Sequence, residues 1–160
     1  MLRIGTFYIL IAILCLCPVA FLSSAELESW QAVQRGDYES VEKTWLPRAQ
    51  RGEVEAQLFL GHLETMRERY GAAAKWYKRA AAKGNVTAQA LLASQYLVGR
   101  GVEADPVRAF AWYMLAENQG HANAVRAREA TALQMTAEEV AAASQLAEDW
   151  IRDGPPTELE

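Results

Sequence analysis

Residues 88–120 read AQALLASQYLVGRGVEADPVRAFAWYMLAENQG, and residues 56–84 read AQLFLGHLETMRERYGAAAKWYKRAAAKG, which is the same pattern in shorter form. The Ala-Gln pairs that open the two segments are 32 residues apart, whereas the Trp-Tyr pairs and the closing glycines are 36 residues apart. The difference of four residues falls between the two halves of the unit. A period of this length with an inner turn of variable length is typical of stacked helical hairpins.

The residues that carry the repeat form an ordered pattern in each unit. In the second unit they are Ala88, Leu92, Ala93, Tyr96, Gly99-Arg100-Gly101-Val102, Asp105, Ala109, Trp112-Tyr113, Ala116 and Gly120. In the first unit they are Ala56, Leu60-Gly61, Ala74, Trp76-Tyr77, Ala80-Ala81 and Gly84. The pattern resembles the Sel1-like repeat, a relative of the tetratricopeptide repeat. The first unit departs from it by having Glu64 in place of the usual tyrosine and by lacking the G-x-G-V turn.

The resemblance implies an all-α fold, a short right-handed solenoid of stacked antiparallel helix pairs with a C-terminal capping helix. Independently of the resemblance, the apolar positions recur at helical spacing, and Asp105-Pro106 fits a helix N-cap followed by proline at the first helical position. We expect the glycines and aromatic pairs of the repeat to have structural roles. They are Gly61, Trp76, Tyr77, Gly84, Gly99, Gly101, Trp112, Tyr113 and Gly120.

These patterns predict six segments along the chain. They are a signal segment (1–25), a degenerate helical unit (26–53), a first repeat (54–85), a second repeat (86–121), a half repeat with a capping helix (122–153) and a disordered tail (154–160). Thr136 and Glu139 form a capping box ahead of the last amphipathic helix. Pro47 predicts a kink or an early end in its helix, because proline lacks an N–H and clashes with the preceding turn.

The first 25 residues have the pattern of a secretory signal peptide. Arg3 is followed by an apolar run over residues 9–16 and by the small residues Ser23-Ser24-Ala25, so we expect cleavage after Ala25. The alternative is an uncleaved anchor over residues 6–22, whose length is at the lower edge of what spans a membrane. We expect an exported, periplasmic protein in the first case and an inner-membrane protein facing the periplasm in the second.

The mature chain is acidic and has no cysteine. Only Arg3 among the 16 basic residues and none of the 20 acidic residues lies before residue 26, which leaves a net charge of −5. Nucleic-acid affinity comes largely from neutralising phosphates, so we expect no nucleic-acid partner. Cys15 and Cys17 both lie in the signal segment. Disulfides, thiolate catalysis and cysteine-zinc sites are therefore not expected.

No residue pattern points to catalysis or to a metal. His62 and His121 each lack a second histidine or a carboxylate at metal-ligand spacing on a shared helix face. Gly99-Arg100-Gly101 joins two helices, whereas a phosphate loop follows a strand and needs a lysine and a hydroxyl residue. The serines lack the flanking glycines of a nucleophile elbow. We expect no enzymatic activity and no cofactor.

Two surfaces are candidates for binding a partner. Stacked hairpins form a concave surface from the first helix of each pair, and the tetratricopeptide-like register places on it Leu58, His62, Thr65, Ala90, Ser94 and Leu97. The second candidate is a basic face on one helix, made of Lys75, Lys78, Arg79 and Lys83. The basic face suits an acidic partner or anionic headgroups, although a solvated outer helix face explains it equally well.

We interpret the chain as a non-enzymatic interaction module or adaptor of the bacterial cell envelope, with an envelope protein or peptide bound on its concave face. One alternative is a protein that binds or modifies the cell wall, because some relatives of the family are linked to cell-wall metabolism and to β-lactam binding. The absence of a nucleophile constellation and of that branch's disulfides weighs against it. The other is a membrane-anchored assembly factor, which requires an uncleaved N-terminal segment. The oligomeric state stays open.

Overall fold

The computed structural model describes residues 24–156, and these are helical with no strand among them. The chain divides into two compact units, residues 1–37 and 38–160. The described part of the first unit holds α2 (Ser24–Gln34). The second unit holds α3 (Tyr38–Gln50), α4 (Val54–Met66), α5 (Tyr70–Ala82), α6 (Val86–Val98), α7 (Pro106–Asn118), α8 (Ala124–Ala132) and α9 (Ala137–Asp153). The all-α prediction is confirmed.

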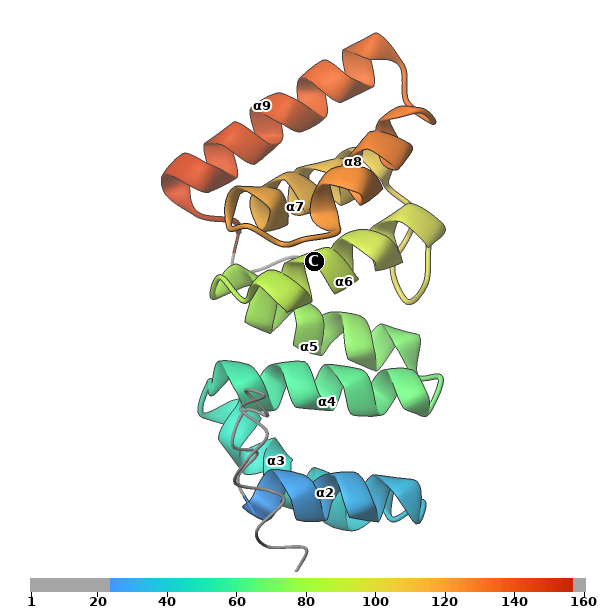
Figure 1. Cartoon of the computed structure of the whole chain (residues 1–160), viewed down its shortest axis with the longest axis vertical. Helices are drawn as coiled ribbons and strands as arrows, with labels where there is room; N and C mark the ends of the chain where they lie inside the picture. Colours follow the sequence, from blue (N-terminus) through green and yellow to red (C-terminus); the bar gives the residue numbers. More distant parts are fainter. Residues whose placement is uncertain (1–23, 157–160) are drawn as a thin grey trace, which may run out of the picture. The chain divides into compact units, whose positions relative to one another are not determined.

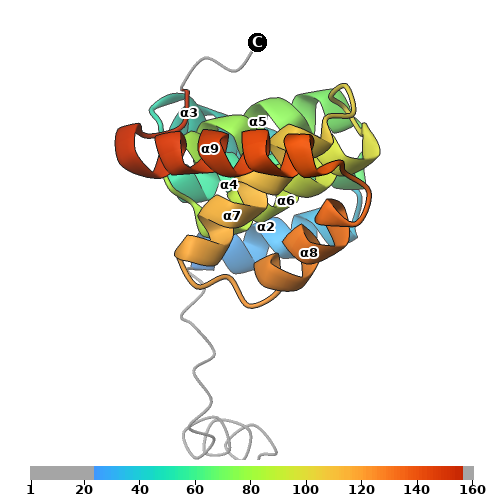
Figure 2. The same cartoon turned by 90° about the horizontal axis from the view of Figure 1, so that it is seen from above.

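Helices α4 and α5 form one antiparallel pair, and α6 and α7 form the next. Helices α3 to α9 follow one another along the stack (Figure 1), and α5 and α8 lie on opposite sides of it (Figure 2). The second helix of each pair also packs on the first helix of the next, as in α5 with α6 and α7 with α8. Fully buried alanines such as Ala80, Ala88 and Ala109 line these contacts, because their small side chains let neighbouring helix backbones approach closely.

The inner turn is the part in which the two repeats differ. Three residues join α4 to α5, and Glu68 takes a positive φ of 58° there. Seven residues join α6 to α7, and they begin with Gly99 in the left-handed conformation. Gly101 (φ 78°) lies directly against the start of α5, since a Cβ added to it would come within 2.3 Å of the Tyr70 carbonyl. Glycine at this position lets the long turn rest on the preceding repeat.

The C-terminal helix α9 begins as predicted. The Thr136 side chain accepts a hydrogen bond from the Glu139 N–H, and the Glu139 carboxylate accepts one from the Thr136 N–H, which completes the capping box. Helix α9 packs on α7, where the Trp112 and Trp150 ring centroids lie 4.7 Å apart. Helix α8 also packs on α7 but barely contacts α9. The last helix therefore covers the second helix of repeat 2 and does not pair with α8.

Pro47 does not end its helix early. Helix α3 continues through it to Gln50, so of the two expected outcomes the early stop does not occur, and the kink stays a prediction. Pro47 leaves the carbonyl of Lys43 without its helical N–H donor. Both residues are exposed, so water can take the place of that donor.

The predicted signal segment lies almost entirely outside the described residues, as does the end of the predicted tail. Within residues 24–156 no helix combines the length and the apolar character needed to cross a membrane.

Candidate functional site

The six residues predicted to line the concave surface come from the first helix of each repeat. We call them the inner row. The α4 members are Leu58, His62 and Thr65, and the α6 members are Ala90, Ser94 and Leu97. Ser94 is exposed and the other five are half-buried. Its aliphatic members Leu58, Ala90 and Leu97 pack their inner sides against the hydrophobic core. The row therefore offers partly exposed apolar atoms beside polar groups.

In repeat 1, the polar members of the inner row form hydrogen bonds with a hydroxyl group from the second helix. The Tyr77 hydroxyl lies 3.1 Å from Thr65 Oγ1 and 3.3 Å from His62 Nδ1. Thr65 Oγ1 donates to the Gly61 carbonyl at 2.9 Å, so Tyr77 donates to Thr65, and a proton on Nδ1 lets His62 donate to Tyr77. Burial raises the pKa of Tyr77, and the hydrogen bond with Thr65 acts in the opposite direction.

Repeat 2 also places a tyrosine hydroxyl near its inner row. Burial raises the pKa of Tyr113, and the nearby Ser94 side chain acts in the opposite direction. Ser94 follows His62 by 32 residues and Tyr113 follows Tyr77 by 36, so the partners occupy equivalent places in the two repeats. A tyrosine hydroxyl therefore meets the inner row once in each repeat.

The aromatic and glycine residues assigned to the repeat frame take up packing positions. Tyr77, Trp112 and Tyr113 are buried and Trp76 is half-buried. Gly61 faces the Tyr77 ring so closely that a Cβ would lie 2.3 Å from it. A positive φ is found at the remaining four, Gly84, Gly99, Gly101 and Gly120.

The four cations of the predicted basic face do not share one partner. The Lys83 ammonium donates to the Gly52 carbonyl at 2.6 Å, and the Arg79 guanidinium stacks 4.7 Å from the centre of the Trp76 ring. Lys78 turns toward α6, where its ammonium lies 5.8 Å from the Tyr96 ring centroid, and Lys75 is exposed. These cations therefore have several different environments along one helix.

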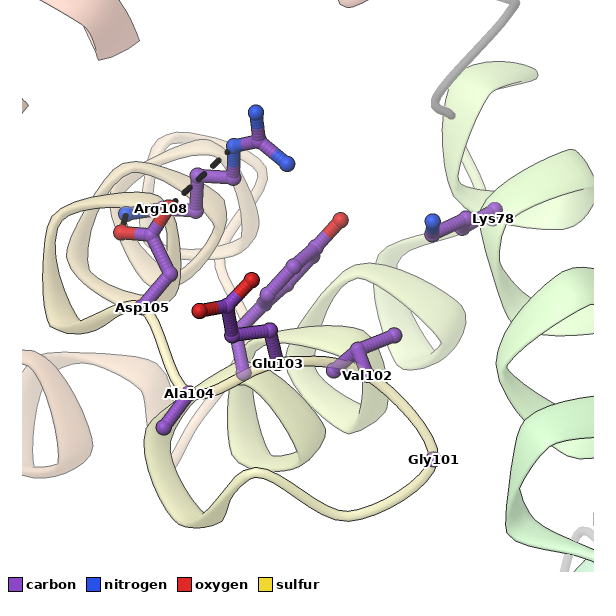
Figure 3. A pocket seen from close by; sticks show the side chains of 8 residues that line it. Lys78, Gly101, Val102, Glu103, Ala104, Asp105 and Arg108 are labelled. Carbon is purple, nitrogen blue, oxygen red and sulfur yellow. Dashed lines mark hydrogen bonds and ion pairs between the residues drawn. The ribbon is translucent and has the colours of Figure 1, made fainter.

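Lys78 also lines a hollow that the sequence analysis missed. This hollow, which we call the niche, has a volume of about 550 Å³ and is lined by Lys78, Tyr96, Arg108 and residues 101–105. Figure 3 shows Lys78 entering from α5 on one side and Arg108 from α7 on the other. The sequence feature that could have indicated it is Tyr96 beside the longer turn, at the position where the first repeat has Glu64.

The described residues 24–156 hold no group of three or more histidine, cysteine, aspartate or glutamate side chains that could bind a metal ion.

Comparison with known proteins agrees with this geometry. A model of the Sel1 repeat matches residues 54–85 and 86–121, the bounds expected for the two repeats. The chain carries two Sel1 repeats. Sel1 repeats generally mediate protein–protein interactions and are typically scaffolds without catalytic activity.

One similar solved structure is that of a protective antigen present in uropathogenic Escherichia coli strains, which displays an SLR fold. The two sequences are 29% identical and their structures align with a TM-score of 0.65. The match covers 70% of this chain and 25% of that one, so the Sel1-repeat chain spans only a quarter of its relative. No curated protein matches this chain.

The stability of the protein should depend on pH through the burial of His62. Burial lowers the pKa of His62 below its usual value of about 6.5. As the pH falls through that usual value, the unfolded chain takes up a proton before the folded chain does, so the free energy of unfolding decreases. We expect the protein to be less stable at about pH 5.5 than at about pH 7.5, with this loss reduced in His62→Gln.

Urea unfolding of both proteins at the two pH values measures this effect. His121, the second histidine, is present in both proteins, so its contribution cancels in the comparison. Equal losses of stability in the wild type and in His62→Gln would contradict the prediction.

Proposed function

We propose that this Sel1-repeat protein is an exported adaptor that holds a segment of a partner protein along the inner row and carries out no catalysis itself. The observation that carries the proposal is that each repeat places a tyrosine hydroxyl beside a polar residue of the inner row. The Tyr77 hydroxyl is within hydrogen-bond distance of Thr65 and His62 in the first repeat, and the Tyr113 hydroxyl lies near Ser94 in the second. A partner segment that crosses the two repeats would meet similar chemistry at a regular interval.

The half-buried aliphatic residues suit the same role. Leu58, Ala90 and Leu97 have their inner sides against the core, so their positions are fixed before a partner binds. Fixed apolar contacts reduce the conformational entropy lost on binding. The neighbouring hydroxyls and the imidazole add hydrogen bonds that distinguish one partner segment from another.

The proposed location rests on the N-terminal sequence. Arg3, the apolar run and the small residues before Glu26 are the pattern of an export signal, which would place the adaptor in the bacterial envelope. The partner would then be an envelope protein or peptide.

Site-specific photocrosslinking in intact cells tests this function. A photoreactive amino acid is placed at position 62 or 94, with position 133 as the control, since Leu133 is 89% exposed and lies outside the repeats. We expect one discrete protein adduct from positions 62 and 94 and none from 133. Mass spectrometry of the adduct then identifies the partner.

Other outcomes would redirect the assignment. An adduct obtained only with the probe at Lys75 would move the binding surface to the basic face. Recovery of glycan fragments alone would favour the cell-wall alternative. An adduct on a protein that keeps residues 1–25, found by N-terminal sequencing, would favour a membrane-anchored assembly factor.

A further inference from the structure

The niche lies between the second helices of the two repeats. Lys78 of α5 and Arg108 of α7 stand on its two sides, Tyr96 of α6 lines it between them, and the long turn of repeat 2 closes one edge. Its volume of about 550 Å³ is within the range of small-ligand sites. These residues are separate from the inner row.

Tyr96 is the unusual residue of the niche. Its side chain is 2% exposed, and its hydroxyl is buried without a hydrogen-bond partner among the described residues. Buried hydroxyls are normally hydrogen-bonded, because an unpaired one loses its bonds to water without replacement. A ligand atom that accepts a hydrogen bond would supply the missing partner.

Two cations lie on either side of the same ring. The Lys78 ammonium is 5.8 Å and the Arg108 guanidinium 5.7 Å from the Tyr96 ring centroid. Both belong to long side chains that are at least partly exposed, with Arg108 44% exposed, so they can part to admit a ligand. Two positive groups around an unpaired hydroxyl favour an anionic acceptor.

Repeat 1 already contains such an anion at the equivalent position. Glu64 stands where repeat 2 has Tyr96, and its carboxylate is buried. One carboxylate oxygen lies 3.2 Å from Arg67 Nη1 and the other lies 3.9 Å from Arg69 Nη1. The first repeat thus holds its own carboxylate between two arginines. The second repeat has the cations and a hydroxyl but no carboxylate at this position.

The acidic residues of the niche limit the charge of the ligand. Asp105 caps α7 by accepting from the Arg108 N–H at 2.9 Å, and its other oxygen lies 3.3 Å from Arg108 Nε. This contact orients the guanidinium, and its two terminal nitrogens point away from Asp105 (Figure 3). Glu103 also lines the niche and is exposed. Two carboxylates this near would repel a doubly charged phosphate more than a singly charged carboxylate.

We propose that the niche binds the carboxylate of a peptide, from either a chain terminus or an aspartate or glutamate side chain. Lys78 and the terminal nitrogens of Arg108 hold the two oxygens, and the Tyr96 hydroxyl donates a hydrogen bond to one of them. The site would give the protein a second contact for a partner, on the opposite helix of each pair from the inner row. The proposal does not depend on the inner row binding anything.

Titration of the full-length protein with three small probes tests the proposal. N-acetyl-alanyl-alanine carries a terminal carboxylate, N-acetylglutamate amide carries only a side-chain carboxylate, and N-acetyl-alanyl-alanine amide carries none. Backbone amide NMR shifts report binding at Tyr96 and at residues 101–105. We expect saturable shifts there with at least one carboxylate probe and none with the amide. The carboxylate probe that binds more tightly shows whether the niche prefers a chain-terminal or a side-chain carboxylate.

Variants separate binding from folding. Tyr96→Phe removes only a hydroxyl that has no partner within residues 24–156, so the protein should stay folded while the carboxylate probe binds several-fold more weakly. Lys78→Gln and Arg108→Gln should each weaken it about tenfold, since a charged hydrogen bond is lost. Lys75→Gln, an exposed lysine on the same helix, should change nothing.

Three results would overturn the proposal. They are shifts of equal size with the amide probe, equal weakening by Lys75→Gln and Lys78→Gln, and tighter binding of inorganic phosphate than of either carboxylate.

Discussion

Replacing Trp112 with alanine should lower the free energy of unfolding by about 3–5 kcal/mol, the usual cost of removing a large buried aromatic side chain. Trp112 is fully buried, and its ring contacts that of Trp150 at 4.7 Å between centroids. The substitution leaves a cavity between α7 and α9 at the contact that joins the second repeat to the C-terminal helix. Urea unfolding followed by far-UV circular dichroism measures the loss.

Trp112→Phe is the matched control. The indole N–H of Trp112 is buried and has no hydrogen-bond partner among the described residues, so phenylalanine removes volume without breaking a bond. The loss should be clearly smaller than for alanine. Hydrogen exchange in Trp112→Ala should also show α9 opening more readily than α4. Similar losses for the two variants would mean that the ring contact with Trp150 contributes little.

Gly101→Ala should destabilise the protein by about 2–5 kcal/mol, because alanine meets two costs at this position. The positive φ of 78° costs roughly 1–2 kcal/mol for a residue with a Cβ. The new Cβ would also lie 2.3 Å from the Tyr70 carbonyl carbon and oxygen and 2.7 Å from the Gly71 nitrogen. These are backbone atoms, so the turn itself must shift, at a further cost of about 1–3 kcal/mol.

Gly120→Ala isolates the first of these costs. Gly120 has a similar φ of 82°, and a Cβ there would meet nothing within 4 Å. Its alanine variant should therefore lose only the strain of the left-handed conformation. Thermal unfolding of the two variants side by side gives the difference. If Gly101→Ala were no less stable than Gly120→Ala, the long turn would not rest on α5 as described.

The helices and their ends could be predicted from sequence because their determinants are local. The repeat spacing located both hairpins, and the caps at Asp105 and Thr136 form with residues three positions further on. The inner row is different. The register placed its residues on one helix face, but it could not show that the Tyr77 and Tyr113 hydroxyls reach them, since each contact joins two helices.

The niche and the packing of α9 could not be predicted for the same physical reason. Lys78, Tyr96 and Arg108 belong to three different helices, and only the crossing of those helices brings them together. The apolar stripe of α9 shows that one face must be buried. It does not say whether α7 or α8 buries it. The sequence shows that the second repeat has Tyr96 where the first has Glu64. Only the structure shows that the Glu64 carboxylate lies between Arg67 and Arg69.

The position of α9 decides how this array can grow. In a regular array each new hairpin docks on the pair before it, so every finished pair is a template for another. Because α9 lies on α7 and barely touches α8, the last two helices do not present that template. The C-terminal end of the array therefore acts as a terminator. Two copies of the protein should not extend each other from this end into a fibre, and any self-association has to use another surface.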